Sequence, residues 1–179
     1  MAKTLWELDP AHSEMVFKVK HLMITTVTGH FRKFTVEALT EGNDFSNATG
    51  IAFSADVNSI DTNNKQRDEH LRSAEFFDAE NNGLIKFTGI DYKTDGDEAI
   101  LTGILEIRGV ANNVKVNVDF GGIAVDGYGQ TKAGFTIHGK ISRKEFGLTW
   151  GAVTEAGKVV VGDEVRFHGE IQLIKQILS

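Results

Sequence analysis

Apolar and polar residues alternate along most of this chain. The clearest example is a segment whose alternate positions are Met15, Phe17, Val19, His21 and Met23. The same period-two pattern recurs at residues 34–38, 51–57, 114–120, 133–141 and 165–173, and in shorter form at 84–92 and 99–108. Because successive side chains of a β-strand point to opposite faces, this pattern predicts strands with one apolar face and one polar face.

Turn-forming residues separate these segments. Gly, Asn and Asp gather at residues 41–44, 81–83, 95–97 and 126–127, and an Ala-Gly pair stands at 156–157, as expected between antiparallel strands. Eight or more strands with one apolar face each must pack as two sheets or close into a barrel, and closure also removes exposed strand edges. We therefore predict an all-β fold, a single antiparallel β-barrel of about eight to ten strands. It is expected to form one domain over residues 1–179.

One polar segment breaks the alternation. Between Thr62 and Ser73, residues Arg67, His70 and Leu71 follow the i, i+3, i+4 spacing of a helix. Thr62 is a suitable N-cap because its hydroxyl can accept a hydrogen bond from the first turn. The sequence therefore predicts one short helix near residues 62–73, and a second turn at 142–147.

Composition and charge narrow the functional classes. The chain has 179 residues, a formal net charge of −6 and no cysteine. The negative charge, without a basic stripe to neutralise phosphates, argues against nucleic-acid binding. The lack of cysteine removes disulfides, thiol nucleophiles and zinc–thiolate sites.

The sequence also bears on location. No segment reaches the ~18 consecutive apolar residues of a membrane-spanning helix. The opening Met1–Pro10 has neither the apolar core nor the cleavage site of a signal peptide. As it stands, the sequence predicts a cytoplasmic protein, or a periplasmic one if a leader has been trimmed.

Motifs of catalysis and metal binding do not occur. The chain contains no G-x-S-x-G, no H-E-x-x-H and no phosphate-binding glycine loop. Six histidines lie on separate segments without the paired spacing of metal ligands: His12, His21, His30, His70, His138 and His168. We therefore expect no metal site, no cofactor and no enzymatic activity.

Three polar residues nevertheless lie where a ligand can meet them. His21 falls in an apolar register, so it is either a hydrogen-bonded core histidine or a polar group that orients a ligand inside a cavity. Arg67 and His70 share one face of the expected helix. That face is either solvated or part of a lid whose cations meet an anionic head group.

Phenylalanine dominates the aromatic residues. Most of these residues fall in or near the expected strands: Phe17, Phe31, Phe34, Phe53, Phe76, Phe77, Phe87, Phe120, Phe135, Phe146 and Phe167. Small barrels either fill their interior with such side chains or hold one ligand between them. Periodicity does not separate a packed core from a pocket lining.

Ordered sequence blocks along the chain resemble one known family. They are Trp6–Ser13, Phe17–Leu22, Val27–Phe31, Ser59–Thr62, Arg67–Ser73, Glu75–Asp78, Gly103–Gly109 and Ile141–Gly147. Together they resemble the YceI-like family of bacterial lipocalin-like barrels over nearly the whole chain. The sequence differs from the family's usual pattern in showing no leader and in lacking a proline within Asn81–Phe87.

The resemblance implies a lipocalin-like barrel with a long apolar tunnel that holds a polyprenyl chain or an isoprenoid quinone. It implies binding, storage or transport of such a lipid without turnover. The candidate ligand-binding residues are Phe17, Val19, His21, Met23, Phe31, Phe34, Phe53, Arg67, His70, Leu71, Phe76, Phe77, Phe87, Phe135, Phe146 and Phe167.

Two other interpretations stay open at this point. The protein is an enzyme if His21 acts as a general acid–base on a bound apolar substrate, which requires a second polar group within reach. It is a structural or interaction barrel if its interior is fully packed. Exposed strand edges or the barrel mouth can also form a homodimer.

Overall fold

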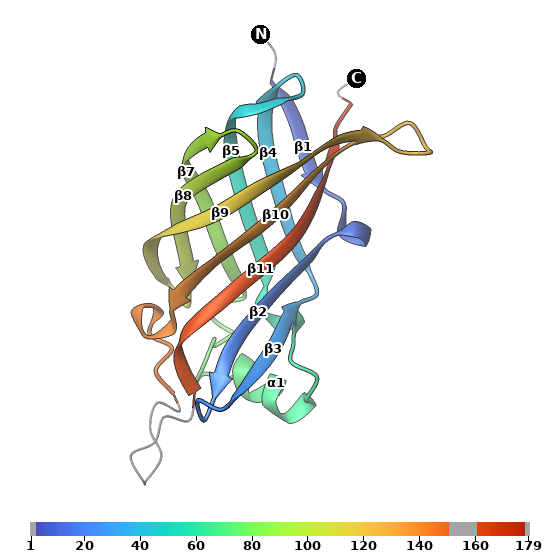
Figure 1. Ribbon diagram of the computed structural model, residues 1–179. Coiled ribbons are helices and arrows are strands. Elements are labelled where there is room, and N and C mark those ends of the chain that lie inside the picture. The colour runs from blue at the N-terminus through green and yellow to red at the C-terminus, as the bar shows by residue number, and fades with distance from the viewer. Residues whose placement is uncertain (1–2, 151–160, 178–179) are drawn as a thin grey trace.

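Eleven antiparallel strands form one continuous sheet in the computed structural model, which describes residues 3–150 and 161–177 (Figure 1). The strands are β1 (Thr4–Leu8), β2 (Glu14–His21), β3 (Thr25–Phe31), β4 (Phe34–Glu41), β5 (Asp44–Asp56), β6 (Ile60–Asp61), β7 (Leu84–Asp95), β8 (Glu98–Ile107), β9 (Val110–Val125), β10 (Thr131–Ser142) and β11 (Val161–Lys175). Short 3-10 turns lie at η1 (Pro10–His12), η2 (Val57–Ser59) and η3 (Arg143–Phe146). The turn predicted at 142–147 is confirmed by η3, whereas the one predicted at 156–157 lies outside the described residues.

Eight of these strands close into a barrel. The order β1-β4-β5-β7-β8-β9-β10-β11 returns to its start because β11 also pairs with β1, through Trp6–Lys175 and Leu8–Leu173. Strands β9, β10 and β11 run diagonally across the front of the molecule in Figure 1. The predicted all-β antiparallel barrel with one short helix is thus confirmed.

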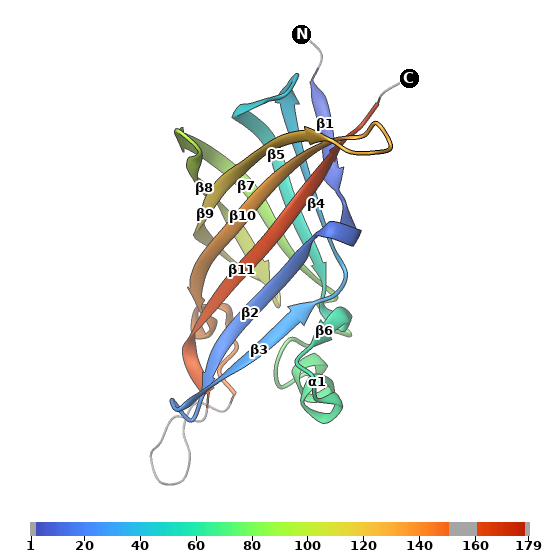
Figure 2. The same cartoon turned by 45° about the vertical axis from the view of Figure 1, so that its right-hand side comes forward.

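Strand β11 changes partner along its length. It pairs with β2 as far as Glu170 and with β1 from Leu173 onward. At the changeover, the carbonyl of Gln172 accepts the Asp9 N–H at 2.8 Å, and the Gln172 N–H donates to Ser13 Oγ at 2.9 Å. Strands β2, β3 and β6 therefore form a side branch that extends the wall toward the helix (Figure 2).

The helix α1 (Lys65–Arg72) stands at the end of the barrel where this branch lies. The prediction that Thr62 is its N-cap is wrong. Asn64 caps it instead, since the Arg67 N–H donates to Asn64 Oδ1 at 2.9 Å. Thr62 is buried, and both its N–H and its hydroxyl donate to the buried Asp68. No helix among the described residues is long and apolar enough to cross a membrane.

Strand β2 ends two residues earlier than the alternation indicates. His21 is its last residue, and Leu22 and Met23 form a turn with φ angles of 52° and 59°. Met23 is consequently 59% exposed. The expectation that Met23 continues the apolar register into the barrel is wrong, because the chain reverses direction before it reaches that residue.

Aromatic side chains close the end of the barrel opposite α1. Trp6 is fully buried, and its indole N–H donates to Thr40 Oγ1 at 2.7 Å. The ring of Phe45 lies 4.8 Å from that of Trp6 and 5.0 Å from that of Phe135, and the Phe135 ring lies 5.2 Å from that of Phe120. These contacts form one packed group, so the interior ends there.

A buried ion pair ties the β9–β10 end of the barrel to η1. Lys132 Nζ lies 2.5 Å from Asp9 Oδ2 and 3.5 Å from Asp126 Oδ2, and His12 Nδ1 lies 2.8 Å from Asp9 Oδ2. Burial alone would raise the pKa of Asp9, but the hydrogen bonds and charges of Lys132 and His12 outweigh it and hold that pKa below its ordinary value. The cluster is a structural element that links residues 123 positions apart.

Candidate ligand-binding cavity

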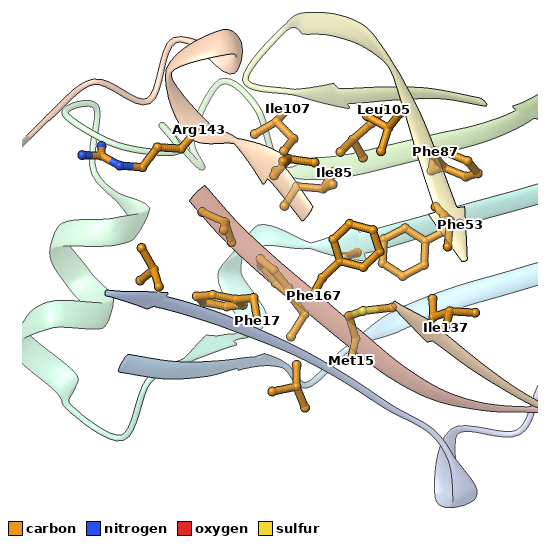
Figure 3. A pocket seen from close by; sticks show the side chains of 18 of the residues that line it. Met15, Phe17, Phe53, Ile85, Phe87, Leu105, Ile107, Ile137, Arg143 and Phe167 are labelled. Atoms are coloured by element: carbon orange, nitrogen blue, oxygen red, sulfur yellow. The ribbon is translucent and has the colours of Figure 1, made fainter. Parts of the chain in front are cut away.

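A cavity of about 730 Å³ runs along the barrel interior from the aromatic group at Phe45 and Phe135 to helix α1. Its wall is made almost wholly of apolar side chains contributed by strands all around the barrel (Figure 3). The volume falls within the range of about 300–1,000 Å³ that small-molecule sites occupy. A fully packed interior, the structural-barrel interpretation, does not agree with this cavity.

Glycines opposite phenylalanines keep the interior open. Phe17 pairs with Gly29 across β2 and β3, and Phe167 pairs with Gly139 across β11 and β10. In both pairs the end of the ring occupies the space where a Cβ on the glycine would stand; for Gly139 that Cβ would lie 2.5 Å from Phe167 Cζ. The rings therefore lie against the barrel wall instead of extending across the cavity.

Most of the candidate ligand-binding residues line this cavity. They are Phe17, Val19, His21, Phe31, Phe53, Arg67, His70, Leu71, Phe76, Phe77, Phe87, Phe135 and Phe167. For those that lie on strands, this position agrees with the apolar register of the strand. Contact with a ligand stays a prediction for each of them.

Three candidates lie elsewhere. Met23 is exposed in the β2–β3 turn, as described above. Phe34 is buried at the start of β4, where its ring packs 5.8 Å from that of Phe53, outside the cavity wall. Phe146 is 1% exposed within η3 and belongs to the packed core. None of the three lies on the cavity wall. For Phe34 and Phe146 the reason is that a buried apolar position in a barrel can also belong to the solid part of the core, and for Met23 it is that the strand ends before this residue.

Sequence reasoning missed several wall residues. Arg143, Trp150, Tyr92 and Phe45 all line the cavity. Phe45 follows a turn at the start of β5, before the alternation of that strand begins, so no period-two signal marks it. Burial raises the pKa of Tyr92, which keeps its phenol neutral within the apolar wall.

Basic side chains lie on the cavity wall without acidic ones. The described lining residues include five basic ones, Lys20, His21, Arg67, His70 and Arg143, and no Asp or Glu. This contrasts with the net charge of −6 of the whole chain. The basic residues come from the end of β2, from α1 and from η3, so they gather at the α1 end, which we call the mouth of the cavity.

Arg143 is the most buried of these basic residues. It is 2% exposed, and its guanidinium donates to four backbone carbonyls, those of Leu148, Trp150, Val161 and Gly162, at 2.6–3.0 Å. Burial lowers the pKa of Arg143, against the charge of Asp163, which raises it. The side chain thus joins the segment after η3 to the first residues of β11 and places a positive charge at the mouth (Figure 3).

Arg67 and His70 both face the cavity from α1. The Arg67 guanidinium donates to the hydroxyl and the carbonyl of Thr62, with Nε 2.7 Å from Oγ1. His70 Nε2 lies 2.7 Å from Glu75 Oε2, and its ring centroid lies 4.3 Å from that of Trp150. The helix therefore presents two positioned polar groups to the interior, and their contact with an anionic head group stays a prediction.

His21 lies at the mouth and not within the core. It is exposed, at the end of β2, so of the two alternatives for this residue the core histidine does not hold. Within the described residues, the histidine rings that are hydrogen-bonded to another side chain are those of His12, His70 and His168, and not that of His21. No group of three His, Asp or Glu side chains in this part of the chain is placed to hold a metal ion. The acid–base interpretation thus finds no partner for His21 in the part of the chain that is described.

Residues 6–173 match the YceI-like domain. A protein of Staphylococcus epidermidis described as a UPF0312 protein is 33% identical over 172 residues, covering 94% of this chain and 96% of its own length.

Two solved structures extend the comparison. The YCEI protein of Campylobacter jejuni is 29% identical, covers 95% of this chain and 97% of its own, and superimposes with a TM-score of 0.75. A polyisoprenoid-binding domain from Saccharophagus degradans, implicated in plant cell wall breakdown, is 14% identical, covers 96% of this chain and 98% of its own, and has a TM-score of 0.66. At that identity the second likeness concerns the fold alone.

Proposed function

Because this chain belongs to the YceI-like family, we propose that it binds a long apolar isoprenoid lipid, a polyprenyl chain or an isoprenoid quinone, inside its barrel. It stores or transports this lipid without chemical turnover. The observation that carries the proposal is the apolar cavity of about 730 Å³ with its charged groups gathered at one end. The S. degradans domain, which shares the fold, is a polyisoprenoid-binding domain, and this supports the choice of lipid.

The geometry favours one orientation of the lipid. An apolar chain fits the part of the cavity between Phe135 and Phe17, where each CH₂ buried from water contributes about 0.8 kcal/mol to binding. A polar head group placed there would lose its hydration without hydrogen-bond partners, which is costly. The head therefore lies at the mouth, near Arg67, His70 and Arg143.

Binding of this kind is reversible. Relative to lipid in water, the free energy gained by burying some tens of carbons would nominally exceed the limit of about 18–21 kcal/mol seen for the binding free energy of non-covalent complexes. Ordering a flexible chain offsets part of this gain. In a cell the competing state is lipid in a membrane, and transfer from one apolar environment to another is nearly neutral. A carrier needs this balance, because it must both load and release.

The test is native mass spectrometry of the freshly purified protein, followed by extraction and identification of any lipid, and by reloading with a quinone and a polyprenyl phosphate. We expect a bound species of prenyl-lipid mass that is lost on denaturation. A protein that is free of lipid and takes up neither compound would refute the proposal.

A pair of neighbouring variants makes this test specific for the interior. Val116 is buried on the cavity wall, and Asn117 is the next residue of β9, exposed on the outer face. Val116→Trp fills part of the cavity and is expected to reduce the amount of lipid bound, whereas Asn117→Trp leaves it unchanged. Equal lipid content in the two variants would show that the lipid binds somewhere else.

A further inference from the structure

The turn between β2 and β3 exposes three large apolar side chains in a row. Leu22 is 41% exposed, Met23 59% and Ile24 77%. Single exposed apolar residues are common on soluble proteins, but a contiguous group at the tip of a hairpin marks a surface that contacts something apolar. We call these three residues the apolar tip.

The backbone of the apolar tip has a conformation that suits other residues better. Leu22 and Met23 both have positive φ, and the Ile24 N–H donates to the His21 carbonyl at 3.1 Å. This is the pattern of a type I′ turn, whose central positions favour Asn-Gly because L side chains are strained at positive φ. Leu and Met at these two positions give up stability and place apolar side chains in water. Backbone strain of this kind clusters at functional sites.

The hairpin that carries the tip is basic. No Asp or Glu occurs between Glu14 and Glu37, whereas Lys18, Lys20 and His21 lie on β2 just before the tip. All three are exposed. In a chain of net charge −6, this local excess of positive charge is complementary to an anionic surface.

The apolar tip lies beside the mouth of the cavity. Lys20 and His21 line the cavity, and His21 pairs with Val161, whose carbonyl is bonded by Arg143. Figure 2 shows the β2–β3 turn at the same end of the molecule as α1. Anything that the tip contacts is therefore close to the opening through which a ligand enters.

We propose that the apolar tip docks on an anionic lipid bilayer. Leu22, Met23 and Ile24 insert among the lipids, while the lysines of β2 lie at the head groups. The mouth of the cavity then faces the membrane surface. The partner is the bilayer itself, and its recognition does not depend on which lipid the cavity holds.

Sedimentation with vesicles tests the proposal without any added ligand. One set of vesicles is pure phosphatidylcholine. The other contains roughly 30–40% of the anionic lipid phosphatidylglycerol, which gives the vesicles a strong negative surface potential. We expect binding to the anionic vesicles, weaker binding to the neutral ones, and a decrease as salt screens the lysine charges.

The decisive variant is Leu22→Asn/Met23→Gly. It supplies the preferred residues of a type I′ turn, so we expect a thermal unfolding midpoint equal to or above that of the wild type. Binding to anionic vesicles is expected to fall about ten-fold or more, since two inserted side chains are lost. Tyr128→Ser is the matched control: Tyr128 is 93% exposed in the β9–β10 turn, at the opposite end of the barrel, and its loss leaves vesicle binding unchanged.

Three outcomes would overturn the proposal. One is a wild-type protein that stays in solution with both kinds of vesicle. Another is a variant with the Asn-Gly turn that sediments as well as the wild type. The third is equal loss of binding in the Tyr128→Ser control, which would indicate adsorption by exposed apolar residues in general. Lipid loading of the cavity is measured separately, so its failure and the failure of docking are distinguishable.

Discussion

The ring of Phe17 lies over Gly29 of the neighbouring strand, in space that any larger side chain at position 29 would need. Phe167 and Gly139 repeat the arrangement. In both cases a strand has no side chain of its own at an inward position, and the partner's aromatic ring covers the backbone there. The barrel thereby gains a smooth apolar wall without filling its centre.

Gly29→Ala is expected to displace the Phe17 ring into the cavity. The atoms nearest to a Cβ at this position all belong to the Phe17 side chain, so the ring moves while the backbone stays. We expect a loss of about 1–3 kcal/mol in unfolding free energy, as for other overpacked sites, together with reduced lipid binding. Urea denaturation and the lipid content measure the two effects. Gly134→Ala, on β10, is the control because a Cβ there meets nothing within 4 Å; an equal effect of both substitutions would refute the prediction.

Truncating a phenylalanine should cost less on the cavity wall than in the solid core. Phe146 is 1% exposed and outside the wall, so Phe146→Ala is expected to create a new void at a cost of about 3–5 kcal/mol. Phe17→Ala enlarges a cavity that exists already and removes a ring that is only partly buried. Its cost is expected to be clearly smaller. Urea denaturation measures the unfolding free energy of both variants. An equal loss of unfolding free energy in the two would show that the interior around Phe17 is packed.

Asp9 is expected to make part of the stability depend on pH. Its pKa in the folded protein is below the value of about 3.9 for an unfolded chain. A carboxylate with a lowered pKa stabilises the fold above that unfolded value, and this contribution is lost as the pH falls through the folded-state pKa. Asp9→Asn should therefore lower stability at pH 7 and lose less stability than the wild type when the pH falls from 5 to 3.

The partner of Asp9 gives the control for this prediction. Lys132→Met removes the cation that holds the carboxylate, so this variant should also lose less stability than the wild type at acidic pH. The double variant should show no weaker dependence on pH than either single variant, since both residues belong to one interaction. If Lys132→Met keeps the wild-type dependence on pH, the ion pair is not its source.

Arg67→Gln is expected to distinguish lipids by their head groups. The guanidinium lies at the cavity mouth, where a charge-assisted hydrogen bond to a phosphate oxygen is stronger than one to a neutral quinone carbonyl. We expect the variant to weaken binding of a polyprenyl phosphate about ten-fold, and that of a quinone by less. Lys65→Gln, on the same helix but outside the wall, is the control. Titration with both lipids measures the two affinities. An equal loss of affinity for both would show that Arg67 does not recognise the head group.

The sequence predicted the barrel because period-two alternation depends only on which face of a strand is dry. It located the cavity wall well where strands are long, as at Phe17 and Phe167. It failed where a strand ends, because alternation carries no signal for a reversal that lacks Gly, Asn or Asp. Leu22 and Met23 form such a turn, so the alternation wrongly places Met23 in the interior.

Other features depend on contacts between distant residues. Asp9 and Lys132 form a buried pair although nothing in their local sequences marks them. Arg143 is recognised as a structural cation only when the four carbonyls around it are known. The volume of the interior also cannot be predicted from the alternation of apolar and polar residues. It depends on which inward positions are glycines that face aromatic rings across a strand pair.

The change of partner along β11 divides the sheet into two parts with different roles. The closed ring of eight strands contains Trp6 and Lys132, whereas the end of β2 contributes to the mouth together with α1 and η3. The hydrogen bonds that close the barrel therefore do not pass through the turn between β2 and β3. Changes of size or charge at that turn alter the surface beside the mouth and leave the closure of the ring in place.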